Sequence, residues 1–447
     1  MSSAPNTIDK RMSIIALTWP LFIEIMLRTA LNTSDVFMLS GYSDKAVSAV
    51  GVIAQISFFL IIISSMVSSG TGILIAQYNG SNRQQDSAYV GVASVIMSAF
   101  VGIFLSLFAV CAAYSLLPYY GLEAQVEHYA QEYLLISGAM TFNVTMGIVL
   151  TTILRSHGYS RSPMVVNLIA GVINIVGNYI ALYQPFGLPV YGVQGVAIST
   201  VFAQILSTVM LCYKVRNSDI ELPFAQWRAI PRDIYRRIVR IGSMNAGEVL
   251  AYNLAQITII YFVVQMGTAS LAAFTYAQNI ARISFAFALA LGQASQIQAG
   301  YFIGRGLIDS ILIRVQKYFL VGFIVTNIVT ITTYFCSDII IAWFTDQAEI
   351  AALTATLIAG SILLESGRVF NLIFISALKA AGDIKFPVQM GIFSMWGLGV
   401  LFSYLLGVHW GYGVIGAWMA IALDEWFRGL IMAQRWRSKV WTRYQLT

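Results

Sequence analysis

Long apolar windows recur along almost the whole chain and constrain its fold more than any other feature. A helix rises about 1.5 Å per residue, so about 20 apolar residues cross the roughly 30 Å of hydrocarbon in a bilayer. Only 10% of the 447 residues are charged, whereas soluble domains average about 25%. The sequence therefore predicts an all-α integral membrane protein.

The windows divide into twelve predicted transmembrane helices. The longest polar stretch between them covers residues 214–240, contains two prolines, and separates the sixth span from the seventh. This stretch predicts two six-helix lobes, residues 1–222 and 223–447. The spans are expected near residues 13–39, 47–78, 88–114, 129–154, 163–183, 192–213, 238–265, 269–300, 314–336, 350–378, 387–407 and 412–433.

Lysine and arginine are unevenly divided between the loops on the two predicted sides. With the N-terminus in the cytoplasm, the inner segments hold 22 of the 26 basic residues and the outer loops hold only Lys45. Cytoplasmic loops of membrane proteins carry such an excess. We therefore expect both termini in the cytoplasm. The other three basic residues, Arg28, Arg282 and Arg368, lie within predicted spans.

The two halves repeat each other at a nearly constant offset. A motif between the fourth and fifth spans of each half recurs 224 residues later: Leu154, Gly158 and Pro163 become Leu378, Gly382 and Pro387. Glu24 lines up with Glu248. Glycine and proline recur at loops of many such proteins, but ordered matches favour duplication. Because each half has six spans, the halves are expected to be related by a pseudo-two-fold axis along the membrane normal.

Composition argues against several other classes of protein. The net charge is +6, but the basic residues lie in short loops between the spans. We therefore expect no nucleic-acid partner. No metal-ligand cluster or nucleophile–base set stands within the spans, so we expect no enzyme, no bound metal and no cofactor. Three unequally spaced cysteines suggest neither a disulfide framework nor a metal site. They are Cys111, Cys212 and Cys336.

The first span carries three charges. Each costs roughly 2.5–3.5 kcal/mol at the centre of a membrane helix on insertion scales. Glu24 and Arg28 stand four residues apart, so they can offset each other. Asp35 has no base three or four residues away in either direction. It is therefore the group predicted to need a proton or a bound cation. The alternative is that Asp35, about 7 Å below the helix end at Ser40, is merely solvated.

Three asparagines are candidate partners for Asp35. Asn32 stands one turn earlier, and Asn174 and Asn178 share a face of the fifth span. With Thr200 of the sixth span, these residues form the predicted cation-coupling and substrate group of the N-terminal lobe. Pro20 removes a backbone donor and crowds the preceding turn, so it is a candidate hinge in the first span. Alternatively, it is a first-turn proline without consequence.

The second half contains four further charges within spans. Glu365 and Arg368 stand three residues apart and are expected to pair, which leaves Glu248 as the candidate partner of Arg282 across helices. Two acids and two bases sum to zero, so one interpretation is a structural network. The other is a second cation site. On the last span, Asp424 and Glu425 with Arg428 leave one acid unpaired.

The ordered motifs together resemble the multidrug and toxic compound extrusion (MATE) family, and its bacterial DinF-like branch most of all. They are Pro20…Asn32…Asp35 with Ala49-Val50-Gly51, Gly70…Ala76-Gln77-Tyr78 with Gly80, Leu154-Arg155…Gly158…Pro163, and Gly195 to Thr200. The resemblance covers the whole chain. It implies a V-shaped pair of six-helix lobes that exports drug-like, often cationic compounds, driven by inward flow of H⁺ or Na⁺.

The resemblance also bears on the candidate sites. Some relatives carry a second acid in the fifth-span cluster, where this chain has Asn178. In the NorM-like branch, acids of the seventh and tenth spans bind a cation, which is the model for a site at Glu248 and Glu365. We expect a multi-pass protein of the bacterial inner membrane, and a monomer.

The main hypothesis is therefore a secondary multidrug exporter coupled through Asp35, with small-molecule drugs, H⁺ or Na⁺, and the lipid bilayer as its partners. A lipid-linked oligosaccharide flippase of the same superfamily is the alternative. A major-facilitator transporter would also have twelve spans, but its usual basic motif after the second span is not matched by residues 80–85.

Overall fold

The computed structural model describes residues 10–183, 187 and 189–446, and every regular element within this part of the chain is helical. The elements of the first half are α1 (Ile14–Ser40), α2 (Asp44–Gly80), α3 (Gln84–Ser115), α4 (Ala124–Ala139), α5 (Thr141–Ser156), α6 (Arg161–Tyr183) and α7 (Gly192–Arg216). Those of the second half are α8 (Arg232–Gln265), α9 (Thr268–Gly304), α10 (Ile308–Phe335), α11 (Ser337–Ala342), α12 (Ala348–Ala380), α13 (Lys385–Ser394) and α14 (Gly413–Arg437).

Short elements connect or extend these helices. Two π-helical segments prolong α13, and together the three run from residue 385 to residue 409. Four 3₁₀ turns whose residues are all described lie at loops and ends. They are Lys10–Met12, Leu117–Tyr120, Phe224–Ala229 and Val440–Tyr444.

The predicted spans correspond to these helices. Within the described residues, ten helical segments are long and apolar enough to cross a membrane, and α4 with α5 makes an eleventh that bends by 47°. The predicted twelfth span is α14, which carries Asp424, Glu425 and Arg428 in its middle. These charges lower its apolar character. The prediction of an all-helical membrane protein is confirmed.

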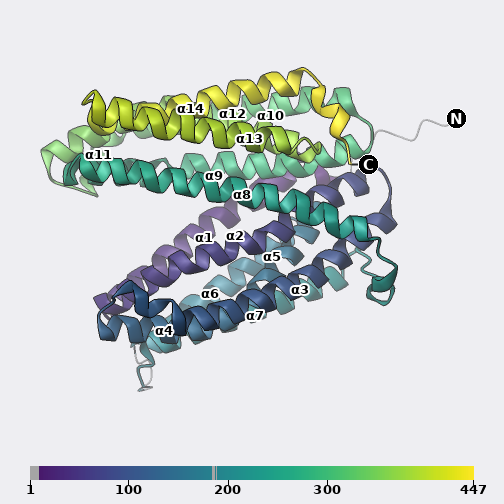
Figure 1. Cartoon of the computed structure of the whole chain (residues 1–447), viewed down its shortest axis with the longest axis horizontal. Helices are drawn as coiled ribbons and strands as arrows, with labels where there is room; N and C mark the ends of the chain where they lie inside the picture. The colour runs from purple at the N-terminus through teal and green to yellow at the C-terminus, as the bar shows by residue number, and fades with distance from the viewer. Residues whose placement is uncertain (1–9, 184–186, 188, 447) are drawn as a thin grey trace. The chain divides into compact units, whose positions relative to one another are not determined.

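The chain forms two compact units. Residues 1–75 and 83–246 make the first, and residues 76–82 and 247–447 make the second, so the division passes within α2 and within α8. In the first unit, α3 packs on α5, and α6 packs on α1 and α7. In the second unit, α12 packs against α9, α10 and α14 (Figure 1). The predicted lobes 1–222 and 223–447 stay a prediction.

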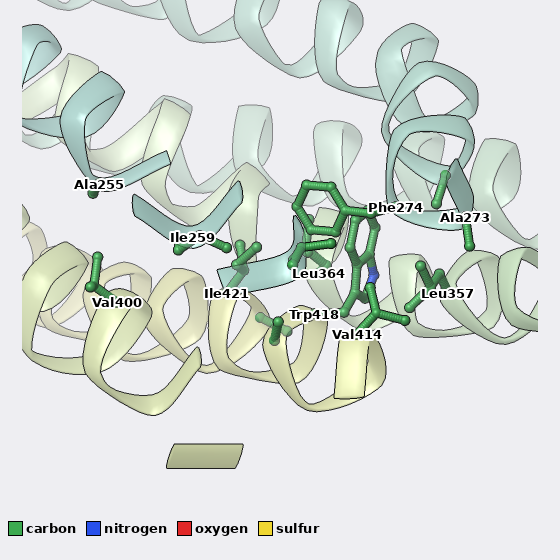
Figure 2. Close-up of a cluster of buried hydrophobic side chains, with 14 of the residues drawn as sticks. Ala255, Ile259, Ala273, Phe274, Leu357, Leu364, Val400, Val414, Trp418 and Ile421 are labelled. Atoms are coloured by element: carbon green, nitrogen blue, oxygen red, sulfur yellow. The ribbon is translucent and has the colours of Figure 1, made fainter. Parts of the chain in front are cut away.

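The second unit is organised around a buried apolar cluster. Phe274 of α9 and Trp418 of α14 meet edge to face with ring centroids 5.3 Å apart, an arrangement that favours the ring quadrupoles. Leu357 and Leu364 of α12 pack beside them, and Ile259 enters from α8 (Figure 2). This packing fixes which face of each helix points inward.

Glycines allow the C-terminal end of α2 to cross α9 closely in the second unit. A Cβ added at Gly80 would lie 2.0 Å from the carbonyl oxygen of Tyr301, and one added at Gly304 would lie 2.0 Å from that of Gln77. Both obstacles are backbone atoms, which cannot rotate away. The crossing therefore depends on the absence of side chains at these two positions.

We predict that Gly80→Ala destabilises the protein by about 1–3 kcal/mol, because overpacking forces the backbones apart. The measurement is the thermal unfolding midpoint of the detergent-purified variant. Gly51→Ala is the matched control on the same helix, since a Cβ there would have nothing within 4 Å. Equal midpoints for the two variants would show that the close crossing contributes nothing.

Candidate functional site

Asp35 lies in the second half of α1 and is hydrogen-bonded to α6. The side-chain amide of Asn178 donates to Asp35 Oδ1 at 2.7 Å. Asn178 is fully buried, whereas Asp35 is half-buried. Among the described residues, no basic side chain forms a salt bridge with Asp35. The carboxylate is therefore stabilised by an amide dipole and has no compensating positive charge.

A second polar contact joins α6 to α7 nearby. Asn174 donates to Thr200 Oγ1 at 3.2 Å, and the Ser199 hydroxyl donates to the backbone carbonyl of Asn174 at 3.1 Å. Gly177 makes this approach possible, because a Cβ there would lie 2.1 Å from Ser199 Oγ. The predicted group is thus brought together in two hydrogen-bonded pairs, Asp35–Asn178 and Asn174–Thr200.

Two details of the predicted group differ in the structure. Asn32 is exposed, and its side chain makes no hydrogen bond to Asp35 within the described part of the chain. Asn174 bonds Thr200 rather than Asp35, because it lies one helical turn before Asn178 on α6. Sequence reasoning also missed Tyr133 of α4, which lies next to Thr200. A single tyrosine within an apolar segment gave no signal that it belongs here.

One atom of this site has no partner. Asn178 Oδ1 is buried and accepts no hydrogen bond from the residues that the structure describes. A buried acceptor without a donor is costly. A protonated Asp35 carboxyl is a group that could donate to that oxygen.

Glu24 lies on the same helix as Asp35 but in a different electrostatic environment. It is 3% exposed and forms a salt bridge with Arg155, the penultimate residue of α5. Asn167 of α6 donates to its other carboxylate oxygen at 2.8 Å. The predicted partner Arg28 stands 3.9 Å away, with 72% of its side chain exposed. The charge of Glu24 is therefore compensated mainly by Arg155 of another helix rather than by Arg28 on its own helix.

Pro20 lies inside α1, six residues after the helix begins at Ile14, and is buried. It is therefore not a first-turn proline. The absent donor falls in the second turn of the helix, where an intrahelical hydrogen bond would otherwise form.

In the second unit, α12 and α14 carry a connected ionic network. Arg368 pairs with Glu365 at 2.5 Å, as predicted, and its Nε lies 3.5 Å from Glu425. Arg428 contacts both acids of its own helix, Asp424 at 3.0 Å and Glu425 at 3.1 Å. Arg368 of α12 gives Glu425 a second basic partner, so neither Asp424 nor Glu425 is unpaired. Most of this network was not predicted.

The predicted pairing of Glu248 with Arg282 is wrong. Glu248 forms its salt bridge with Lys379, near the end of α12. Arg282 instead donates to Asn279 on its own helix at 2.9 Å. Sequence reasoning treated Lys379 as a loop residue, but α12 continues to Ala380, which brings Lys379 within reach of Glu248.

The two units therefore hold their acids differently. Among the described residues, the second unit has five buried carboxylates, and each contacts at least one of four basic side chains. Asp35 in the first unit has only an amide. Protonation of Asp35 would therefore break none of the salt bridges seen among the described residues.

We predict that Glu24→Gln destabilises the protein by about 3–5 kcal/mol, because it leaves Arg155 without its acid. The double variant Glu24→Gln with Arg155→Gln should lose less stability than the sum of the two single variants. The measurement is a double-mutant cycle on thermal or denaturant unfolding in detergent. Strict additivity would contradict a direct interaction.

The comparisons with known proteins agree with this architecture. Uncharacterized transporter YisQ of Bacillus subtilis is 37% identical, covering 97% of this chain and 95% of the relative. A probable multidrug resistance protein NorM of Thermotoga maritima is 22% identical, over 97% of this chain and 93% of the relative.

Solved structures share the fold. The outward-facing conformation of a multidrug resistance MATE family transporter of the MOP superfamily superimposes with a TM-score of 0.87 at 20% identity, covering 97% of this chain and 96% of the other. A MOP superfamily transporter from Pyrococcus furiosus superimposes with a TM-score of 0.84 at 20% identity, covering 97% of this chain and 96% of the other. That protein is described as having a binding pocket of reverse polarity.

The MatE family model matches the chain twice, over residues 20–180 and 246–405. One matched segment lies within each of the two predicted halves. Together they cover more than half of the chain. The chain therefore belongs to the MatE family and is a membrane transporter rather than an enzyme.

Proposed function

We propose that this chain is a secondary multidrug exporter of the DinF-like branch, which moves drug-like, often cationic compounds outward in exchange for H⁺. The observation that carries the proposal is Asp35, a carboxylate within a spanning helix whose hydrogen-bond partner is an amide and not a base. A carboxylate in this setting changes the local charge by one unit when it binds or releases a proton.

A proton suits this site better than Na⁺. Asn178 presents its amide nitrogen, a donor, to the carboxylate, whereas a metal cation needs acceptor oxygens around it. One carboxylate and one donor make a poor Na⁺ site. The orphaned Asn178 Oδ1 would gain a donor if the Asp35 carboxyl became protonated and rotated toward it. Na⁺ coupling would require the amide to turn over.

In the proposed cycle, deprotonated Asp35 favours binding of a cationic drug in the first unit. Protonation from outside removes the negative charge, weakens drug binding and promotes release. The empty, protonated carrier then turns inward and loses its proton. Pro20, in the N-terminal part of α1, is the proposed point at which that helix bends during the change.

The same proposal includes the arrangement expected from the sequence. The chain would lie in the bacterial inner membrane as a monomer with both termini cytoplasmic. Its lobes 1–222 and 223–447 would be related by a pseudo-two-fold axis. The ionic network of the second unit would hold its lobe together, because Glu365 and Glu425 both contact Arg368.

We expect Asp35→Asn to abolish drug resistance in cells while leaving the amount of protein in the membrane unchanged. The amide keeps the size of the side chain but cannot exchange a proton. Asp44→Asn is the matched control, because Asp44 is an exposed acid just beyond α1. Resistance equal to that of the parent protein in Asp35→Asn would remove Asp35 from the mechanism.

Dye transport in reconstituted vesicles tests the coupling ion. An imposed proton gradient should drive uptake of a cationic dye such as ethidium against its concentration gradient, and a sodium gradient at uniform pH should not. Asp35→Asn should remove the proton-driven component. Transport driven by sodium alone would overturn H⁺ coupling, and selective binding of a lipid-linked oligosaccharide in place of dyes would favour the flippase.

A further inference from the structure

We infer that Arg282 of α9 binds the single negative charge, such as a carboxylate, of anionic or zwitterionic substrates. The inference rests on the proposed export of drug-like compounds and adds a recognition element to it. It comes from the position of Arg282 on its helix, its neighbours there and its lack of an acidic partner.

The packing of the second unit determines where Arg282 points. Ala273, Phe274, Ala277 and Ala281 of α9 are buried. The first three belong to the apolar cluster with Trp418 and Leu357, and Figure 2 labels Ala273 and Phe274. At about 100° per residue, position 282 falls on the side away from this cluster. Arg282 is accordingly exposed.

Arg282 completes a polar stripe on this exposed face. Thr275, Gln278 and Asn279 precede it at helical spacing, and all three are exposed. Asn279 donates to the backbone carbonyl of Thr275 at 3.0 Å and accepts from Arg282 Nη2 at 2.9 Å. The guanidinium is therefore held against the helix by one N–H, and its other donors are available to a ligand.

Arg282 differs from the other arginines predicted within spans. Arg368 is paired with Glu365 at 2.5 Å, and Arg28 lies 3.9 Å from Glu24. Among the described residues, no acid lies within salt-bridge distance of Arg282. Exposing an unpaired charge to hydrocarbon is energetically costly, so charged side chains within spans face water or a partner. The exposed stripe therefore fits a surface that meets water and solutes.

The chemistry of one arginine limits the ligand. A guanidinium fits a carboxylate or phosphate oxygen pair with two parallel hydrogen bonds. A pyrophosphate carries more charge than one base can neutralise. A single guanidinium flanked by amides and a hydroxyl therefore fits a monoanionic group on an otherwise uncharged or cationic molecule.

The experiment compares two dyes that differ by one negative charge. Rhodamine B carries a carboxylate, and its ethyl ester does not. Binding of each dye to the detergent-purified protein would be followed by fluorescence polarisation. Arg282→Gln should weaken binding of rhodamine B about tenfold, an equilibrium change of about 1.4 kcal/mol, and leave binding of the ester within about twofold. Arg282→Lys keeps the positive charge but cannot donate two parallel hydrogen bonds to a carboxylate, so it should weaken binding of rhodamine B by an intermediate amount.

Arg28→Gln is the matched control, since it removes another exposed arginine within a span and should not discriminate between the dyes. If Arg282→Gln weakens binding of both dyes equally, or of neither, the carboxylate site is wrong. Ester binding by Arg282→Gln also reports that the variant is folded. Failure of the proposed function would look different, because the parent protein would then transport neither dye under a proton gradient.

Discussion

The salt bridge between Glu24 and Arg155 is the interaction around which the first unit is arranged. A buried carboxylate without compensation costs several kcal/mol, so the acid in α1 fixes where the end of α5 must lie. Asn167 of α6 supplies the remaining hydrogen bond. One charge thus ties three helices together and sets the direction in which α1 presents its other face. Asp35 is three turns farther along that helix, where α6 offers only an amide.

The second unit contains a corresponding salt bridge between two helices. Glu248 pairs with Lys379, and the two residues are 131 positions apart, the same separation as between Glu24 and Arg155. Gly80 and Gly304 also correspond, and each lets its helix approach the backbone of the other. A duplicated ion pair and a reciprocal glycine crossing are stronger signs of duplication than recurrent loop glycines, because each requires two distant positions to match.

The sequence predicted the spans and the chemistry of neighbouring residues better than it predicted contacts between helices. Apolar length alone indicated the helices, and spacing along one helix gave the Glu365–Arg368 pair. The partners of Glu24 and Glu248 were missed because Arg155 and Lys379 read as loop residues, although each continues its helix. Pairing Arg282 with Glu248 assumed that charges in the same half must meet. Helix rotation, set by packing such as Phe274 on Trp418, decides that question instead.

These contacts also explain why the two units are expected to respond differently to a proton. Protonating Glu425 would remove the charge that holds Arg368 of α12 to α14, and protonating Glu365 would remove the acid that Arg368 contacts on its own helix. Either change would act against the packing of the second unit. Protonating Asp35 breaks no salt bridge, because its partner is the neutral Asn178. This difference is why we propose Asp35, rather than the paired acids of the second unit, as the carboxylate that changes its charge during transport.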